Sequence, residues 1–527
     1  MGKSKTLIAV ILSLLCSSIF FGSCSPDLSV DIPSEYKTCV IDYELNGGTN
    51  NDQNKSTIEQ GESVFLTEPS KYGYKFLGWY TEDGDIVTEV TYNEVGIKLY
   101  AMWELESVCY DNLPLVKINT IDSKIPENKQ DYIECDFSLS NTNSYFNNTD
   151  GKYDLQLEMG TVGIRLRGNS TQGMNKKPFR IKFDKKQSLF GYEKNKSWVL
   201  LADYIDQSNI RNYAAFKIAN SVGGVFSPHG THVVLIINGI YQGMYLLTEQ
   251  IDENKGRTAI KSNFNQIVDT DFPFLVEMDR NALLEGEIDV DTFEMENLWY
   301  PIEIKYPEFE ERNVAKGNDV VFSYIKEYMW AVFYTLKTDE KVSVSFREAP
   351  VGFEDLVDED SFLNYILINE IMGNRDNAWG SIYMSKSKNG KLKFGPVWDF
   401  DWSICGGWTG SPYQEICVDY ANEFALIKKY NFHWFYFVNE TRYNKMVNKF
   451  YEIKPKVLKV VNDLIEYYGV IYNASIIDAK HWYGEKGDYM FSSQFCAVRL
   501  FLIDKINYIE SVFSKTFSEA YEMVMNY

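Results

Sequence analysis

The chain has 527 residues, of which 45% are hydrophobic and 15% aromatic, so it can bury large cores and has the length of about three domains. It carries 52 basic and 74 acidic residues, and the diffuse field of a net charge of −22 argues against a general nucleic-acid binder. With only four His, the sequence also disfavours a His-rich zinc site and a Ser-His-Asp hydrolase.

Residues 1–24 have the layout of an export signal, in which two Lys precede a long apolar stretch. Small residues then lead to Cys24, as in a lipoprotein signal whose Cys becomes the lipidated first residue of the mature chain. The alternative is ordinary secretion with a free N-terminus. Residues 25–37 are predicted to be a short tether, and no other stretch is long and apolar enough to cross a bilayer.

Residues 38–104 are predicted to form a small β-rich module. Strands are expected at residues 38–45, 63–66, 71–80 and 98–103, separated by turn residues such as Asn46-Gly47-Gly48. The motifs Tyr43-x-x-Asn46-Gly47-Gly48, Gly73-Tyr74-x-Phe76-x-Gly78-Trp79-Tyr80 and Leu99-Tyr100-Ala101-x-Trp103 resemble an internalin-type B repeat. This resemblance implies a β-grasp-like spacer or adhesion module at a bacterial surface.

The remaining residues, 108–527, contain a basic block that predicts an anion site. Two predicted strands each carry two cations on one face, because side chains at i and i+2 of a strand point the same way. A Gly/Asn/Ser/Thr turn lies between them and adds backbone N–H groups. The polar residues of this block are Arg165, Arg167, Ser170, Lys177, Arg180 and Lys182. The alternative is a solvated sheet face.

Further strands are expected at residues 197–202, 233–237, 241–249, 274–279 and 302–305. Helices are expected at residues 206–220, 320–336, 360–372, 423–464 and 495–513. Glu249 ends an apolar strand and is predicted to pair with a buried Lys such as Lys182, a pair that positions phosphates in protein kinases; the alternative is an exposed strand end. Strands come first and helices later, which predicts an α+β fold with two lobes and a cleft between them.

Two acids follow a Gly-Pro break at residues 395–396. In extended backbone the side chains of Asp399 and Asp401 point the same way, so we expect them to converge on one spot. Two neighbouring carboxylates favour a cation between them, and Mg²⁺ with a bound nucleotide fits. Asp376 and Asn377, at the end of a predicted helix, add a further carboxylate and an amide. The alternative is a solvated turn.

These motifs together resemble the spore-coat protein H (CotH) kinase family over about residues 108–510. The matching motifs include Arg165-Leu166-Arg167-Gly168-Asn169-Ser170-Thr171, Lys176-Lys177-Pro178-Phe179-Arg180-Ile181-Lys182-Phe183, Asn374-x-Asp376 and Pro396-x-Trp398-Asp399-x-Asp401. The resemblance implies a two-lobed atypical protein-kinase-like domain, with a β-rich N-lobe and a helical C-lobe. It also implies phosphorylation of Ser or Thr on exported proteins, with ATP and Mg²⁺ or Mn²⁺ as cofactors.

The resemblance also implies a role for each matching residue. Lys182 would contact the nucleotide phosphates, and Glu249 would pair with it. Asp376 would be a catalytic or metal-ordering acid, and Asp399 the principal Mg²⁺ ligand with Asp401 beside it.

Two functions stay open at this point. The first is an exported atypical Ser/Thr kinase-like lipoprotein that acts on an extracytoplasmic protein. The second is a catalytically silent surface scaffold for a carbohydrate or protein partner, favoured by the repeat module, the lipoprotein leader and the aromatic richness. Ser381 stands where the resemblance implies an Asn, and the loss of that amide would weaken metal binding. Either protein is expected to be exported, at the cell surface or in the periplasm, and to contact the membrane only through its lipid anchor.

Overall fold

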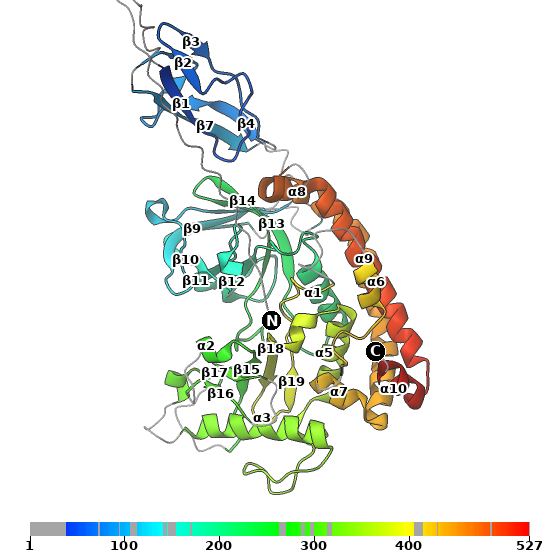
Figure 1. Cartoon of the computed structure of the whole chain (residues 1–527). Helices are drawn as coiled ribbons and strands as arrows, with labels where there is room; N and C mark the ends of the chain where they lie inside the picture. Colours follow the sequence, from blue (N-terminus) through cyan, green and yellow to red (C-terminus); the bar gives the residue numbers. More distant parts are fainter. Residues whose placement is uncertain are drawn as a thin grey trace, which may run out of the picture. The chain divides into compact units, whose positions relative to one another are not determined.

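The computed structural model describes residues 38–71, 74–93, 95–105, 113–140, 145, 154–168, 171–262, 270–285, 290–295, 300–312, 319–404, 415–428, 431–484 and 487–525. The predicted leader with Cys24 and the predicted tether lie outside these ranges. The chain divides into two compact units, one made mostly of residues up to Met102 and one that runs from Trp103 to Tyr527. Each unit is described by itself (Figure 1).

The first unit consists of short strands, as the sequence predicts. They are β1 (Thr38–Glu44), β2 (Thr57–Glu59), β3 (Ser63–Phe65), β4 (Tyr74–Tyr80), β5 (Ile86–Val87), β6 (Glu89–Thr91) and β7 (Ile97–Leu105). Five of them form a sheet in the order β2-β1-β7-β4-β5, in which β1 and β7 run parallel. Cys39 and Ile41 of β1 and Leu99 and Ala101 of β7 are buried, which is the period of two expected for a sheet with one covered face.

Seven strands of the second unit close into a barrel, a closure that the sequence analysis did not predict. Around the barrel their order is β10-β11-β12-β14-β13-β8-β9. They are β8 (Leu115–Ile118), β9 (Ile133–Ser140), β10 (Leu155–Leu166), β11 (Phe179–Gln187), β12 (Asn195–Leu201), β13 (Gly230–Ile237) and β14 (Ile240–Glu249). Ile164, Leu166, Phe179 and Ile181 belong to the buried cluster of the barrel. The basic residues that alternate with them therefore lie on its outer face.

A second sheet and the helices complete this unit. The sheet has the order β16-β17-β15-β18-β19, with β15 (Phe274–Met278), β16 (Thr292–Phe293), β17 (Ile302–Tyr306), β18 (Ile382–Lys386) and β19 (Leu392–Phe394). The helices are α1 (Arg211–Val222), α2 (Ala282–Glu285), α3 (Val320–Thr338), α4 (Phe353–Leu356), α5 (Glu359–Ile371), α6 (Glu415–Ala421), α7 (Phe432–Phe437), α8 (Glu440–Tyr483), α9 (Gly487–Phe513) and α10 (Phe517–Met525). One large hydrophobic cluster joins them, so the predicted α+β class is confirmed.

The helix predicted at residues 423–464 is wrong at both ends. Helix α8 begins after Asn439, whose side chain accepts a hydrogen bond from the backbone N–H of Arg442 at 3.1 Å. Such a cap satisfies a backbone donor that has no partner inside the helix. The whole helix has 44 residues and contains Pro455, and α9 packs along it (Figure 1). None of the described helices combines the length and the apolar character needed to span a membrane.

A buried ion pair joins the barrel to the last turns of α8. The Nζ atom of Lys176, which is 1% exposed, lies 2.9 Å from Asp478 Oδ2 and 2.6 Å from the carbonyl oxygen of Met244. The other carboxylate oxygen of Asp478 accepts from the backbone N–H of Met244 at 2.9 Å. Because the charges are paired and hydrogen-bonded, they can stay buried, and the end of α8 is part of the support of the barrel.

Candidate active site

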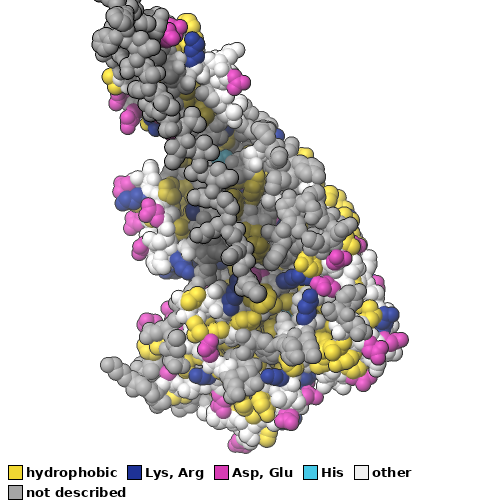
Figure 2. All heavy atoms as spheres, viewed as in Figure 1, with side chains coloured by type: hydrophobic (Ala, Val, Ile, Leu, Met, Phe, Trp, Pro, Cys, Tyr) yellow, Lys and Arg dark blue, Asp and Glu magenta, His cyan; other side chains and the backbone are white. Residues whose placement is uncertain are grey.

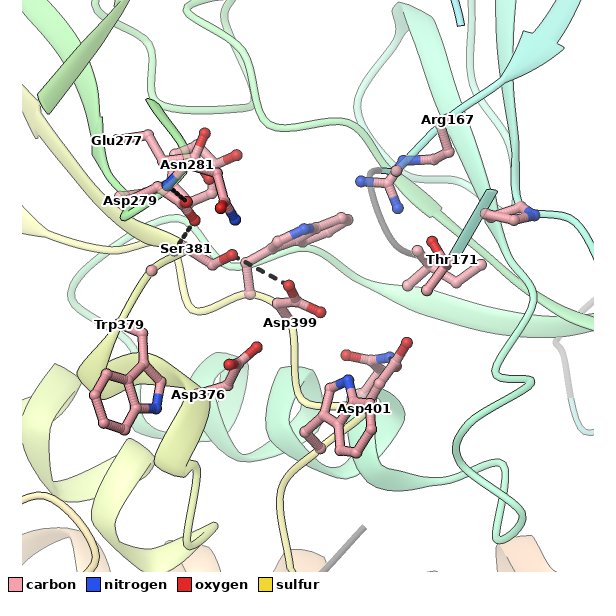
Figure 3. Close-up of a pocket in the computed structure, with 18 of the residues that line it drawn as sticks. Arg167, Thr171, Glu277, Asp279, Asn281, Asp376, Trp379, Ser381, Asp399 and Asp401 are labelled. Carbon is pink, nitrogen blue, oxygen red and sulfur yellow. Dashed lines mark hydrogen bonds between the residues drawn. The ribbon is translucent and has the colours of Figure 1, made fainter. Parts of the chain in front are cut away.

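A cavity of about 1030 Å³ lies between the barrel and the second sheet, with a basic wall and an acidic wall. The basic wall comes from β10, β11 and the turn between them and includes Arg165, Arg167 and Arg180. The acidic wall comes from the second sheet and nearby loops and includes Glu277, Asp279, Asp376, Asp399 and Asp401. In Figure 3, Arg167 and Thr171 stand on one side, Glu277 and Asp279 on the other, and Asp399 between them.

The backbone through the two predicted acids is not extended, which corrects the geometry expected from the sequence. Strand β19 ends at Phe394, and Asp399 has a positive φ of 64°. Both acids line the cavity, yet each carboxylate has its own partner. The hydroxyl of Ser381 donates to Asp399 at 3.1 Å, and the amide of Asn212 donates to Asp401.

The surroundings of these two carboxylates favour their neutral forms. Burial raises the pKa of Asp399, and the charge of Arg167 across the cavity opposes that shift. Burial also raises the pKa of Asp401 well above its usual value, and the charges of Asp203 and Asp399 add to the effect. A cation placed beside the carboxylates would relieve this repulsion.

Asp376 lies on the same wall, in the short turn of helix Arg375–Ala378 that follows α5. Burial raises its pKa to about 6, the charge of Asp399 adds to the shift, and Arg280 opposes it. A carboxyl group whose pKa is close to neutrality is suited to act as a general base.

Asp279 is a site residue that the sequence analysis missed. It follows β15, and its Oδ2 accepts from the backbone N–H of Ser381 at 3.0 Å, while its Oδ1 accepts from that of Asn281 at 2.7 Å. A Cβ at Gly380 would lie 2.2 Å from Asp279 Oδ2, so this approach needs a glycine. Asp279 thus fixes the backbone of Ser381, whose hydroxyl holds Asp399. The only signal in the sequence was an acid at the end of a strand.

The basic wall contains donors that lack partners. Arg165 and Arg180 lie directly opposite each other in the β10–β11 pair. The Nε atoms of both are buried and have no hydrogen-bond partner among the described residues. Arg167 places its guanidinium 5.3 Å from the ring centre of Trp398, the residue before Asp399. Such donors, opposite a row of carboxylates, are suited to hold an anion that also carries a cation.

The predicted pair of Lys182 and Glu249 is not formed. The two residues lie opposite consecutive residues of β12, Ser197 and Trp198 respectively. Because consecutive side chains of a strand point to opposite faces, Lys182 is exposed outside the barrel while Glu249 is buried. The carboxylate of Glu249 accepts instead from Arg257. The prediction failed because it took both residues to lie on the same face of the sheet.

Three other predicted residues also need comment. Lys177 is not among the described residues that line the cavity, and its Nζ donates to the carbonyl oxygen of Gln172 at 2.8 Å. Asn377 is buried and donates to the hydroxyl of Tyr365 at 2.5 Å, away from the cavity lining. Ser170 lies outside the described residues.

The residues of the cavity fit a divalent cation with a bound polyphosphate. Carboxylate oxygens are the ligands that Mg²⁺ prefers, and it takes only one or two of them when substrate phosphates supply the rest. In the part of the chain that the structure describes, no group of three His, Cys, Asp or Glu side chains forms a metal site by itself.

Two family descriptions match the chain. Residues 164–463 match the CotH kinase protein family, and residues 40–102 match the Listeria-Bacteroides repeat domain. No curated protein matches the chain. The first match covers more than half of the 527 residues and includes Arg165 of the basic wall and Asp399 of the acidic wall. The chain therefore belongs to the CotH kinase protein family.

Proposed function

We propose that this protein binds ATP with Mg²⁺ or Mn²⁺ in the cavity and transfers the γ-phosphoryl group to a Ser or Thr hydroxyl of an exported protein. The kinase-like family supports this reading. The observation that carries it is the arrangement of one cavity in which unpartnered arginine donors face carboxylates that repel each other. Phosphoryl transfer needs little more from a protein than positioning and charge stabilisation.

Each wall has its own task in this proposal. The phosphates are bound by Arg165, Arg167 and Arg180 of the basic wall. The principal metal ligand is Asp399, whose carboxylate is held in place by the hydroxyl of Ser381. When bound, the metal nucleotide supplies the phosphoryl group and offsets its negative charge. Asp376 accepts the proton of the attacking hydroxyl, since its pKa of about 6 leaves it mostly ionised at neutral pH.

Asp401 is a second carboxylate toward the metal, and Asn212 positions it. The Nδ2 atom of Asn212 donates to both Asp401 and Asp203, and its Oδ1 accepts from the backbone N–H of Phe400 at 2.9 Å. One amide therefore fixes the side chain and the backbone on the far side of Asp399.

We propose further that the protein is an exported lipoprotein anchored through Cys24, at the cell surface or in the periplasm, with an exported protein rather than a nucleic acid as partner. The charge and the apolar leader support this proposal. The repeat at residues 40–102 is then an internalin-type B module with a β-grasp-like fold, supported by the parallel pairing of β1 and β7. The barrel on one side of the cavity, and the second sheet with the helices packed around it on the other, support a two-lobed kinase-like domain.

A second candidate function is a catalytically silent surface scaffold that binds a carbohydrate or a protein. Two observations favour it. Lys182 and Glu249 do not form the pair that orders phosphates in protein kinases. Ser381, at a position where the family resemblance leads us to expect Asn, offers Asp399 a hydroxyl in place of an amide.

A thermal-shift titration separates the two candidates. The protein without residues 1–24 is heated with ATP, with and without Mg²⁺ or Mn²⁺, beside the Asp399→Ala variant. A ligand that binds only the folded state raises the stability by about 2.7 kcal/mol at a hundred times its Kd. We expect a metal-dependent shift that Asp399→Ala removes and that Asp184→Ala, at an exposed position of β11, retains. No shift at millimolar ATP would leave the scaffold as the function.

A further inference from the structure

Four apolar side chains spaced by seven residues lie in a row along α8. They are Tyr451, Leu458, Ile465 and Tyr472, and we call them the α8 seam. Tyr451 is 42% exposed, Ile465 55% and Tyr472 39%, and Leu458 is half-buried. A seven-residue spacing keeps the side chains on one face, over about 32 Å of helix at the usual rise. Figure 2 shows hydrophobic side chains along the right-hand edge, where Figure 1 places α8 and α9.

The seam is only partly used inside the chain: Leu458 packs against the large hydrophobic cluster, and Tyr472 lies with its ring centre 6.2 Å from that of Phe491 of α9. A different row of the same helix, with Val457, Leu464 and Ile471, is buried in the hydrophobic core. On the side of the seam that faces α9, Tyr468 packs against Phe495 with ring centres 4.3 Å apart. A helix of a globular protein usually shows a single apolar stripe toward the core. The seam extends the apolar surface of α8 beyond the part that the described chain covers.

The order of residues in the seam is symmetric. Tyrosines stand at its two ends and aliphatic residues in its middle, so the row reads alike in both directions. If two α8 helices are placed antiparallel, Leu458 lies against the partner's Ile465, and Tyr451 lies against the partner's Tyr472. This is the self-complementarity that a two-fold interface requires, because each patch must fit a copy of itself.

The charges beside the seam have the same symmetry. Lys459 and Glu466 are exposed on the flank away from α9 and are one heptad apart. The antiparallel arrangement brings Lys459 opposite the partner's Glu466, and by symmetry Glu466 opposite the partner's Lys459. Opposite charges that flank an apolar seam set the partner and the orientation of paired helices. In a parallel two-fold arrangement the same flanks of the two helices would lie on opposite sides of the seam, so Lys459 would not meet the partner's Glu466.

We propose that the α8 seam is an interface between two copies of this chain, with their α8 helices antiparallel. The proposal commits to a second copy because the seam complements itself in both size and charge. It does not depend on the proposed kinase function, since the row is distinct from the residues that line the cavity.

The first test is the mass of the full chain in mild detergent, measured by light scattering over a range of concentrations with the detergent subtracted. We expect a dimer, and we expect Ile465→Glu to weaken self-association at least about 100-fold, because it buries a charge opposite Leu458. Val320→Glu is the matched control, since Val320 is 43% exposed at the start of α3 and should leave the dimer intact. A monomer at every concentration, or a dimer that survives Ile465→Glu, overturns the proposal.

The second test fixes the orientation. Lys459→Glu and Glu466→Lys are each expected to weaken the dimer about tenfold, whereas the chain with both changes should recover it, because the pairs are restored with exchanged signs. In a Cys496→Ser background, copies with Leu458→Cys mixed with copies with Ile465→Cys should cross-link to each other more than to their own kind. No recovery in the double variant, or cross-links mainly between like copies, would show that the antiparallel pairing is wrong.

Discussion

Asp376→Asn is expected to make the folded protein more stable while it removes the proposed base. Burial and the charge of Asp399 raise the pKa of Asp376 from 3.8 to about 6. One pKa unit corresponds to about 1.4 kcal/mol, so the ionised carboxylate costs the folded state about 3 kcal/mol. For an acid whose folded pKa is raised, stability is highest below the unfolded pKa of 3.8 and is lost as the pH rises through about 6.

The assay is urea-induced unfolding of both proteins at pH 8 and pH 5. Asp376→Asn should gain about 3 kcal/mol at pH 8 and about half of that at pH 5, where the natural carboxyl is already largely protonated. Asp184→Asn, at an exposed position of β11, is the control and should change little at either pH. A variant that is less stable than the natural protein at pH 8 would refute the view that this carboxylate is held at a cost.

Three further predictions concern the rest of the site. Arg167→Ala should weaken ATP binding about tenfold in calorimetric titrations, because Arg167 lines the cavity. Lys182→Ala is the control and should leave the affinity unchanged, because Lys182 is exposed outside the barrel. Equal losses of affinity in the two variants would contradict this assignment. Gly380→Ala should lower the free energy of unfolding in urea by about 1–3 kcal/mol, because the added Cβ would meet Asp279. Gly469→Ala in α8 should raise it by about 0.5–1 kcal/mol, because a Cβ there meets nothing within 4 Å. An unchanged stability of Gly380→Ala would disprove the close approach. Asn212→Asp should be more destabilising at pH 8 than at pH 5, because it adds a carboxylate between Asp203 and Asp401 that ionises as the pH rises; a loss that does not depend on pH would count against this reasoning.

The sequence predicted well what depends on short stretches of chain. Alternation predicted that Arg165 shares a face with Arg167 on one strand and Arg180 a face with Lys182 on the next. In the structure Arg165, Arg167 and Arg180 line the cavity, whereas Lys182 does not. The acids Asp376, Asp399 and Asp401 also line it, although the expected extended backbone is replaced by a turn with positive φ at Asp399. Residue type and local spacing were enough for these residues, because each side chain is positioned by the strand or turn on which it lies.

What the sequence could not give depends on which distant strands meet. Barrel closure sets the pairing of β12 with β14, and that register puts Glu249 on the opposite face from Lys182. The contact between Asp279 and the backbone of Ser381 joins residues about a hundred positions apart through a sheet. Neither residue type nor periodicity encodes such register, because a shift of one residue reverses every side chain.

The ion pair of Lys176 and Asp478 limits how far the chain can be shortened at its C-terminal end and still fold. The family match ends at residue 463, in the middle of α8, and Asp478 lies beyond that end. A protein shortened to the match would keep Lys176 in the interior without its carboxylate, and an uncompensated buried charge costs about 3–5 kcal/mol. That loss is a large part of the total stability of an ordinary domain. Recombinant versions should therefore extend at least through α9, because the homologous segment and the folding unit have different C-terminal limits.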